Sequence, residues 1–315
     1  MTPFETANFL RTHDNYLILT HARPDGDTIG SAAGLCLALR QLGKTAHVLP
    51  NPETTSLFVP YLKGLLAPEG WEPDTVVAVD MAARSMCPAN AEIYLPRVDL
   101  TIDHHPSQEF FAKETCLDAS CAACGELIYT IISQLGPVSC DMATALYVAV
   151  STDCGCFQYG NTTADTHRIA AALMDCGIPT AALNKRHFRT KSWKRMQLES
   201  AILSGMELHE NGTIALAALT IQMMDTLNAT EDDTEDIAAL VGQLEGVKTS
   251  VTIREKRDGT CKISMRTAPD DLNANHVCAL LGGGGHAAAS GATLSCGVEE
   301  TKKRVLDAIE QVKHG

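Results

Sequence analysis

The segment that decides the fold runs from Tyr16 to Ser31 and reads YLILTHARPDGDTIGS. It opens with a short apolar run of β-prone residues, Tyr16–Thr20, which predicts a buried strand. The loop His21–Asp27 follows and is rich in Pro, Asp and Gly, the residues that form turns. A helical pattern then extends over Ser31–Leu42 and ends at Gly43. A strand, an ionisable loop and a helix in this order predict the start of an alternating α/β fold.

Further strands and helices extend this pattern toward the middle of the chain. The expected strands are Ala46–Leu49, Thr75–Val79 and Leu100–Ile102. The expected helices are Gly125–Gln134, Asp141–Thr152 and Thr163–Cys176. Strands that alternate with helices predict an N-terminal α/β domain whose parallel sheet has helices on both faces.

The second half has a different pattern, in which strands follow one another directly. The expected strands are Ile214–Thr220, Ser250–Lys256 and Cys261–Arg266, and a hairpin turn at Asp258-Gly259 joins the last two. Helical patterns cover Asn273–Leu281 and Glu299–Lys313. These elements predict a smaller mixed α/β domain. We expect domains over residues 1–186 and 206–315, joined by a helical linker over residues 187–205.

The formal net charge of the 315-residue chain is −13. Proteins that hold long nucleic acids usually present an excess of basic residues, because phosphate neutralisation supplies most of their affinity. We therefore expect any phosphate ligand to be short, and no long duplex to bind. The apolar runs are too short to span a bilayer, and the N-terminal segment has no apolar signal region, so a cytoplasmic protein without membrane contact is expected.

The chain contains 12 cysteines at irregular spacings. In a long chain without an export signal, such cysteines are mostly reduced and serve as small core residues. The pair Cys121-x-x-Cys124 leaves a structural zinc site as an alternative. That site would need two more ligands at a matching spacing, and no second Cys-x-x-Cys exists.

Ionisable residues gather where the predicted strands end. Ligands of open parallel sheets bind in the crevice beyond the carboxyl ends of the strands, so these residues are expected to meet there. Taken alone, Asp25-Gly26-Asp27 could be an ordinary turn and Asp80 a helix cap, but the combination points into one crevice. The residues after the first strand are His21, Asp25 and Asp27, Asp80 follows the third strand, Asp103, His104 and His105 follow the fourth, and Asp153 ends a helix.

Four carboxylates packed together repel one another and lose solvation. Two divalent cations carry four positive charges, which match Asp25, Asp27, Asp80 and Asp153. Mixed carboxylate and imidazole ligands suit Mn(II) first, with Mg, Co, Fe or Zn as alternatives. The sequence therefore predicts a site for two divalent metal ions.

At these residues the sequence resembles the DHH phosphoesterase family. The family's first motif, His-x-x-Pro-Asp-Gly-Asp-x-x-Gly-Ser, matches His21–Ser31, and its second matches Val79-Asp80. The triplet that names the family is Asp103-His104-His105, and the fourth motif, Asp-x-Gly-x-Phe, matches Asp153–Phe157. Cys154 and Cys156 stand where the family often has Thr and Ser, at positions that are not ligands. The C-terminal half resembles the DHH-associated domain at Ser264–Thr267 and at the glycine run that ends in His286.

The resemblance implies a role for each matched residue. One metal ion would be held by His21, Asp25 and Asp80, and the second by Asp27, His104, Asp153 and the shared Asp80. Asp103 would orient an imidazole, and His105 would face the scissile phosphate as a donor. Another phosphate or the terminal nucleotide would bind at Arg266, Gly282, Gly283, Gly284, Gly285 and His286. A homodimer is also expected from the resemblance.

The layout looks most like the nanoRNase and pAp-phosphatase branch of the family, where pAp is 3′-phosphoadenosine 5′-phosphate. This implies hydrolysis of short oligoribonucleotides to mononucleotides, and of pAp to AMP. A cyclic-di-AMP or linear dinucleotide phosphodiesterase is the first alternative, and inorganic pyrophosphate is a weaker one. A nucleotide sensor without catalysis is a rival of another class, but the complete set of expected ligands argues against it.

Overall fold

The computed structural model describes residues 1–234, 237–268 and 271–314. The chain divides into two compact units, the first from Met1 to Thr190 and the second from Lys191 onward. Helix α7 (Trp193–Ser204) therefore lies in the second unit. The assignment of residues 187–205 as a linker stays a prediction.

The first unit is built on a five-stranded sheet in which every pairing is parallel. The strand order is β2-β1-β3-β4-β5, so the neighbours of β1 on its two sides are β2 and β3. The order in which the strands are added to the sheet therefore reverses at β1. In open α/β sheets, ligands bind in the crevice at such a reversal. The strands are β1 (Tyr16–Leu19), β2 (Ala46–Val48), β3 (Thr75–Val79), β4 (Leu100–Asp103) and β5 (Glu114–Leu117).

The two faces of this sheet are covered differently. Side chains such as Ile18, Val77 and Ile102 pack against the α-helices of the first unit. On the other face, Leu17, Val76 and their neighbours pack against loops and the 3-10 helix Ala89–Arg97. The parallel sheet with helices confirms the predicted α/β class, although the helical cover of the second face is a 3-10 helix and loops in place of α-helices. The α-helices are α1 (Pro3–Thr12), α2 (Gly26–Gln41), α3 (Cys124–Ile132), α4 (Cys140–Asp153), α5 (Ala164–Asp175) and α6 (Thr180–Asn184).

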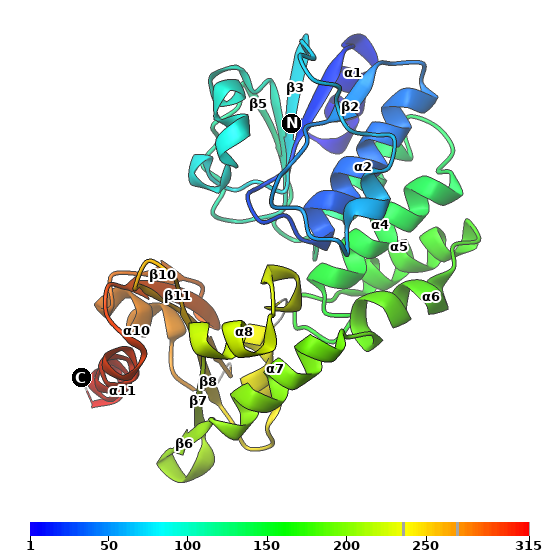
Figure 1. Cartoon of the computed structure of the whole chain (residues 1–315). Helices are drawn as coiled ribbons and strands as arrows, with labels where there is room; N and C mark the ends of the chain where they lie inside the picture. Colours follow the sequence, from blue (N-terminus) through cyan, green and yellow to red (C-terminus); the bar gives the residue numbers. More distant parts are fainter. Residues whose placement is uncertain (235–236, 269–270, 315) are drawn as a thin grey trace. The chain divides into compact units, whose positions relative to one another are not determined.

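Helix α2 begins at Gly26, five residues before the predicted start at Ser31. Asp25 caps the helix, because its Oδ1 accepts hydrogen bonds from the backbone amides of Asp27 and Thr28. The glycines at the start of α2 have a packing role, since α2 runs beside α4 (Figure 1). A Cβ at Gly30 would lie 2.3 Å from the carbonyl oxygen of Ala145 on α4. The prediction of a loop up to Asp27 was therefore wrong, and Asp27 lies in the first helical turn.

The second unit contains a six-stranded mixed sheet in the order β10-β11-β9-β8-β7-β6. Helices α10 and α11 pack on one face, and α7, α8 and α9 pack against β7 on the other. The strands are β6 (Glu207–His209), β7 (Ile214–Leu219), β8 (Thr249–Glu255), β9 (Cys261–Thr267), β10 (Gly284–Gly285) and β11 (Ala289–Leu294). The further helices are α8 (Ile221–Leu227), α9 (Ile237–Leu240), α10 (Ala274–Leu280) and α11 (Val298–His314).

All twelve cysteines are free thiols. Cys124 is buried, and its Sγ donates to the carbonyl oxygen of Ile102 at 3.3 Å. Within the described ranges, no helix is both long and apolar enough to cross a bilayer.

Candidate metal centre

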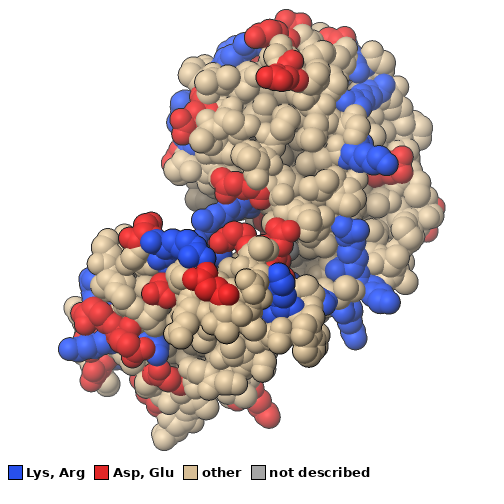
Figure 2. Space-filling view, viewed as in Figure 1, with Lys and Arg blue, Asp and Glu red and all other residues tan. Residues whose placement is uncertain are grey.

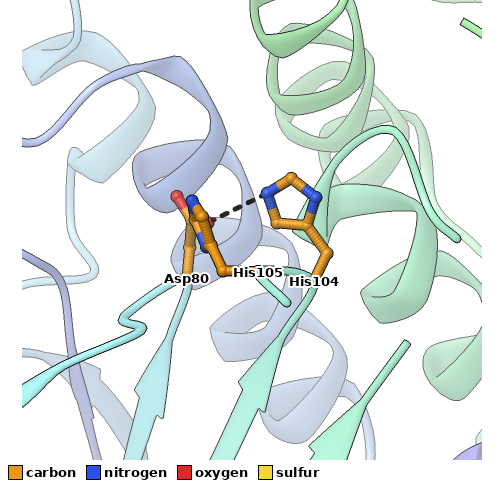
Figure 3. Close-up of side chains that lie close together, drawn as sticks. All are labelled: Asp80, His104 and His105. Atoms are coloured by element: carbon orange, nitrogen blue, oxygen red, sulfur yellow. Dashed lines mark ion pairs between the residues drawn. The ribbon is translucent and has the colours of Figure 1, made fainter. Parts of the chain in front are cut away.

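The ionisable residues expected to meet do lie together at the carboxyl end of the first unit's sheet. Asp80 follows β3 directly, Asp103 ends β4, and Asp25 and Asp27 stand at the start of α2. The side chains of Asp80 and His104 point toward one another from the ends of neighbouring strands (Figure 3). Three groups each place one ligand atom per residue within 4.8 Å of the others. They are His21 with Asp25 and Asp80, Asp27 with His104 and Asp153, and Asp80 with His104 and His105.

The separations within these groups are longer than good hydrogen bonds. The Nε2 atom of His21 is 3.6 Å from an oxygen of Asp25 and 3.6 Å from an oxygen of Asp80. The Nε2 atom of His104 is 3.5 Å from Asp80 Oδ1 and 3.6 Å from Asp153 Oδ2. Hydrogen bonds between such groups are about 2.7–3.2 Å long. Ligand atoms that share one ion at about 2.1 Å lie roughly 3–4 Å apart, so these separations suit ligands of a common cation.

Asp80 belongs to two of the three groups, as His104 does, and its surroundings are unusual. It is only 2% exposed, and its Oδ1 atom has no hydrogen-bond partner. Its backbone adopts the left-handed conformation, with φ of 55°, which costs free energy for a residue other than glycine. A buried carboxylate oxygen without a partner is unfavourable in an apolar interior. A cation at this position would satisfy it, so the residues present fit a metal site.

The two imidazoles at the centre have their other ring nitrogen occupied by the backbone. His21 Nδ1 lies 2.8 Å from the carbonyl oxygen of Ala22, and His104 Nδ1 lies 3.1 Å from that of Cys121. Since a carbonyl oxygen only accepts, each Nδ1 carries a proton, and Nε2 is the nitrogen left to bind a cation. Both Nε2 atoms face the carboxylates. Metal-binding histidines are commonly oriented in this way.

Asp27 is held by the start of helix α3, which the sequence did not reveal. Its Oδ2 accepts from the Cys124 amide at 2.6 Å, and its Oδ1 accepts from the Gly125 amide at 2.9 Å. The hydroxyl of Ser31 also donates to Oδ1. These donors fix the orientation of the carboxylate. Burial nevertheless raises the pKa of Asp27, and the nearby Asp80 carboxylate raises it further.

Without bound cations, protonation of the histidines and carboxyl groups balances the negative charge of this cluster. Burial alone would lower the pKa of His21, but the nearby carboxylates of Asp25 and Asp80 raise it to about 11. Burial would likewise lower the pKa of His104, and Asp80 and other carboxylates raise it to about 10. Burial raises the pKa of Asp153 to about 7 although His104 opposes the shift. The carboxylates therefore demand positive charge, which divalent cations can supply.

His105 differs from the two central histidines. Its Nδ1 lies 2.8 Å from Oδ1 of Asp103, which is fully buried. Burial would lower the pKa of His105, but the hydrogen bond with Asp103 raises it above the usual value. A protonated His105 carries a second proton on Nε2 that it can donate. Gln108 is a further residue that sequence reasoning missed, and its Nε2 donates to Asp103 Oδ2 at 2.6 Å.

The expected substrate-binding residues lie in the second unit. Arg266 is exposed on β9, and its Nη1 donates to the carbonyl oxygen of the preceding residue, Met265. Strand β11 pairs with β9 on one side and with β10 on the other, and Ala289 is the partner of Arg266. Gly282, Gly283, Gly284, Gly285 and His286 are all exposed.

Three of the four glycines are required by the fold itself. Gly282 ends α10 with φ of 78°, and Gly285 has φ of 148°, conformations that favour glycine. A Cβ at Gly283 would lie 2.1 Å from the carbonyl oxygen of Gly291. At Gly284 the nearest atom to a Cβ would be Asn275 Oδ1, at 3.6 Å, which is an ordinary contact. The absence of a side chain at Gly284 is therefore not explained by folding.

The surface charges agree with the acidic composition. On the face seen in Figure 2, basic and acidic side chains are interspersed among uncharged ones, and no broad basic surface is visible. The formal net charge is −13.

Comparisons with known proteins agree with the motifs. Residues 15–150 match the model described as DHH family, N-terminal domain, and residues 213–315 match that of the DHHA1 domain. The bifunctional oligoribonuclease and PAP phosphatase NrnA of Thermus thermophilus is 32% identical over 299 residues, covering 93% of this chain and 89% of the relative. The protein of the same name from Bacillus subtilis is 24% identical over 301 residues, covering 92% of each chain.

Solved structures share the fold. An exopolyphosphatase-related protein from Bacteroides fragilis superposes with a TM-score of 0.87 at 25% identity, covering 98% of this chain and 96% of that one. RecJ from Thermus thermophilus, solved in complex with Mn2+, has a TM-score of 0.54 at 14% identity, covering 98% of this chain and 54% of RecJ. The predicted resemblance is thus confirmed along the chain, which belongs to the DHH family and carries a DHHA1 domain after its DHH domain.

Proposed function

We propose that the protein is a two-metal phosphoesterase that hydrolyses short oligoribonucleotides to mononucleotides and pAp to AMP. The observation that carries the proposal is the cluster at the carboxyl end of the sheet, where groups of acidic and histidine ligand atoms share Asp80 and His104. The name of the Thermus thermophilus relative, with 32% identity over most of both chains, supports this choice of substrate.

In this proposal one metal ion binds to His21, Asp25 and Asp80, and the other to Asp27, His104, Asp153 and Asp80. Carboxylate and imidazole ligands favour Mn(II) among the common divalent ions. When bound, the two ions lower the pKa of a water molecule and offset negative charge on the phosphoryl oxygens.

The other residues act by binding, orientation and proton donation. Asp103 holds His105 through Nδ1, so that Nε2 faces away from Asp103 and can donate a proton to a phosphate oxygen. Arg266 pairs with a second phosphate, and the backbone at Gly284 admits the terminal nucleotide. The homodimer expected from the family resemblance stays a prediction.

The test is hydrolysis by purified protein with Mn(II), in the wild type and in Asp80→Ala. We expect release of mononucleotides from a five-unit RNA and of phosphate from pAp, both abolished by the substitution. A near-normal rate in Asp80→Ala would refute the two-metal proposal. Preference for cyclic di-adenylate would keep the metal site and change the substrate.

A further inference from the structure

Gln108 is a buried amide beside the candidate metal centre, and no motif of the family resemblance includes it. It lies three residues after His105 and is 5% exposed. Its Nε2 donates to Asp103 Oδ2 at 2.6 Å and to the carbonyl oxygen of Met81 at 3.0 Å. Its Oε1 accepts from the backbone amide of Phe110 at 3.1 Å. A buried glutamine with all three of these contacts is held in one orientation.

The partners also fix which end of the amide is which. The Phe110 amide can only donate, so it must face the carbonyl oxygen of Gln108. The Met81 carbonyl can only accept, so it must face the amide nitrogen. The remaining proton on Nε2 therefore points at Asp103. The direction of this last hydrogen bond follows from the network of partners.

Asp103 needs this proton because it is fully buried. Its Oδ1 accepts from the backbone amides of His104 and His105, at 2.8 and 3.3 Å, and lies 2.8 Å from His105 Nδ1. Its Oδ2 has Gln108 as its side-chain donor. With both oxygens engaged, the carboxylate cannot rotate away from His105. A chain of hydrogen bonds thus runs from Gln108 through Asp103 to the imidazole.

We propose that Gln108 is a positioning residue that sets the orientation of His105 through Asp103 and so controls the rate of phosphate-ester hydrolysis. The inference rests on the proposed function, since His105 acts in it as the proton donor. Gln108 itself is held away from the phosphate by its three contacts within the protein. Loss of the Gln108 side chain should therefore slow the chemical step and leave the affinities for substrate and metal unchanged.

The experiment compares wild type with Gln108→Met, which keeps the length of the side chain and removes its donors and acceptor. We expect kcat to fall about 10–100-fold, the usual effect of losing such a supporting contact. The KM for pAp and the dissociation constant for Mn(II), measured by calorimetry, stay within about twofold of wild type, because no direct contact is lost.

Thr75→Val is the matched control, because it removes another side-chain hydrogen bond at the opposite end of β3. Thr75 is 2% exposed, and its hydroxyl donates to the carbonyl oxygen of Asp14 at 3.0 Å. This control should lower the melting temperature without lowering kcat. If Gln108→Met does not fold, Gln108→Ala takes its place, with room for a water molecule, and should show the same pattern with a smaller loss.

Two results would overturn the inference. One is a kcat in the Gln108 variant within about threefold of wild type. The other is a fall in kcat accompanied by an equal fall in Mn(II) affinity, which would mean that Gln108 acts on Asp80 through the Met81 carbonyl. If the wild type itself hydrolyses neither pAp nor short RNA, the proposed function fails instead, so the two failures are distinguishable.

Discussion

Binding of Mn(II) should stabilise the first unit strongly, and the shared ligand Asp80 makes the size of this effect predictable. An ion present at 100 times its dissociation constant adds about 2.7 kcal/mol to the free energy of unfolding. Two ions would add about 5 kcal/mol. For a unit that extends from Met1 to Thr190, each kcal/mol raises the melting temperature by roughly 2–4 °C. Saturating Mn(II) should therefore raise it by roughly 10–20 °C.

Each variant should lose the part of the shift in melting temperature that comes from the ion its residue binds. Asp25 belongs to one candidate metal group, so Asp25→Asn should retain about half of the shift. Asp80 is proposed to bind both ions, and it lies in one group with His21 and in another with His104, so Asp80→Asn should lose nearly all of the shift. Asparagine tolerates the left-handed backbone at position 80, with φ of 55°, so this substitution adds little strain.

The assay is thermal unfolding followed by tryptophan fluorescence. The chain has two tryptophans, and in a Trp193→Phe background Trp71 reports on the first unit alone. Thr75→Val should keep the full Mn(II) shift, since it lies at the other end of β3. An Asp80→Asn variant that keeps the wild-type shift would refute the two-ion assignment, as would a Mn(II) shift of zero in the wild type.

Three other predictions concern residues outside the cluster. Gly284→Ala should fold normally and weaken substrate binding, whereas Gly283→Ala should lower the melting temperature, because a Cβ at Gly283 would clash with the backbone of Gly291. Equal melting temperatures of the two variants would contradict this argument from packing. Arg266→Ala should raise KM for pAp with little change in kcat, and Arg304→Ala on α11 is the exposed-arginine control; a collapsed kcat would indicate a catalytic role instead. Burial lowers the pKa of His187 to about 4, so below about pH 6.5 the unfolded chain binds a proton at this residue that the folded chain does not. The free energy of unfolding should therefore decline as the pH falls from about 6.5 toward 4. Urea unfolding of His187→Gln should lack this part of the decline.

Most strands and helices of the first unit could be predicted from the sequence, because its strands are apolar and end at recognisable residues. Thr75–Val79 is a strand with the predicted bounds, and the structure brings together the ionisable residues that follow the strands. The start of α2 was predicted too late because Pro, Asp and Gly before it are typical of turns, whereas the glycines of α2 serve close packing that only the folded α4 reveals. Strand β11 was missed because Ala, Ser and Gly have low strand propensity, and pairing with β9 stabilises it.

The residues that support the cluster could not be found from the sequence. The backbone amides of Cys124 and Gly125 donate to Asp27. Almost every residue type has such an amide, so the sequence does not show which residues act as donors. Gln108 is an ordinary polar residue in the sequence, and only its burial and three contacts set it apart. Of the four glycines, Gly284 alone combines room for a Cβ with a backbone that does not require glycine, which only the fold reveals.

The most direct test of the central claim is product analysis with purified protein and Mn(II), offering pAp, a linear di-adenylate, a five-unit RNA and cyclic di-adenylate in parallel. We expect rapid release of mononucleotides from the RNA and of phosphate from pAp. No Mn(II)-dependent hydrolysis of any of these compounds would contradict it.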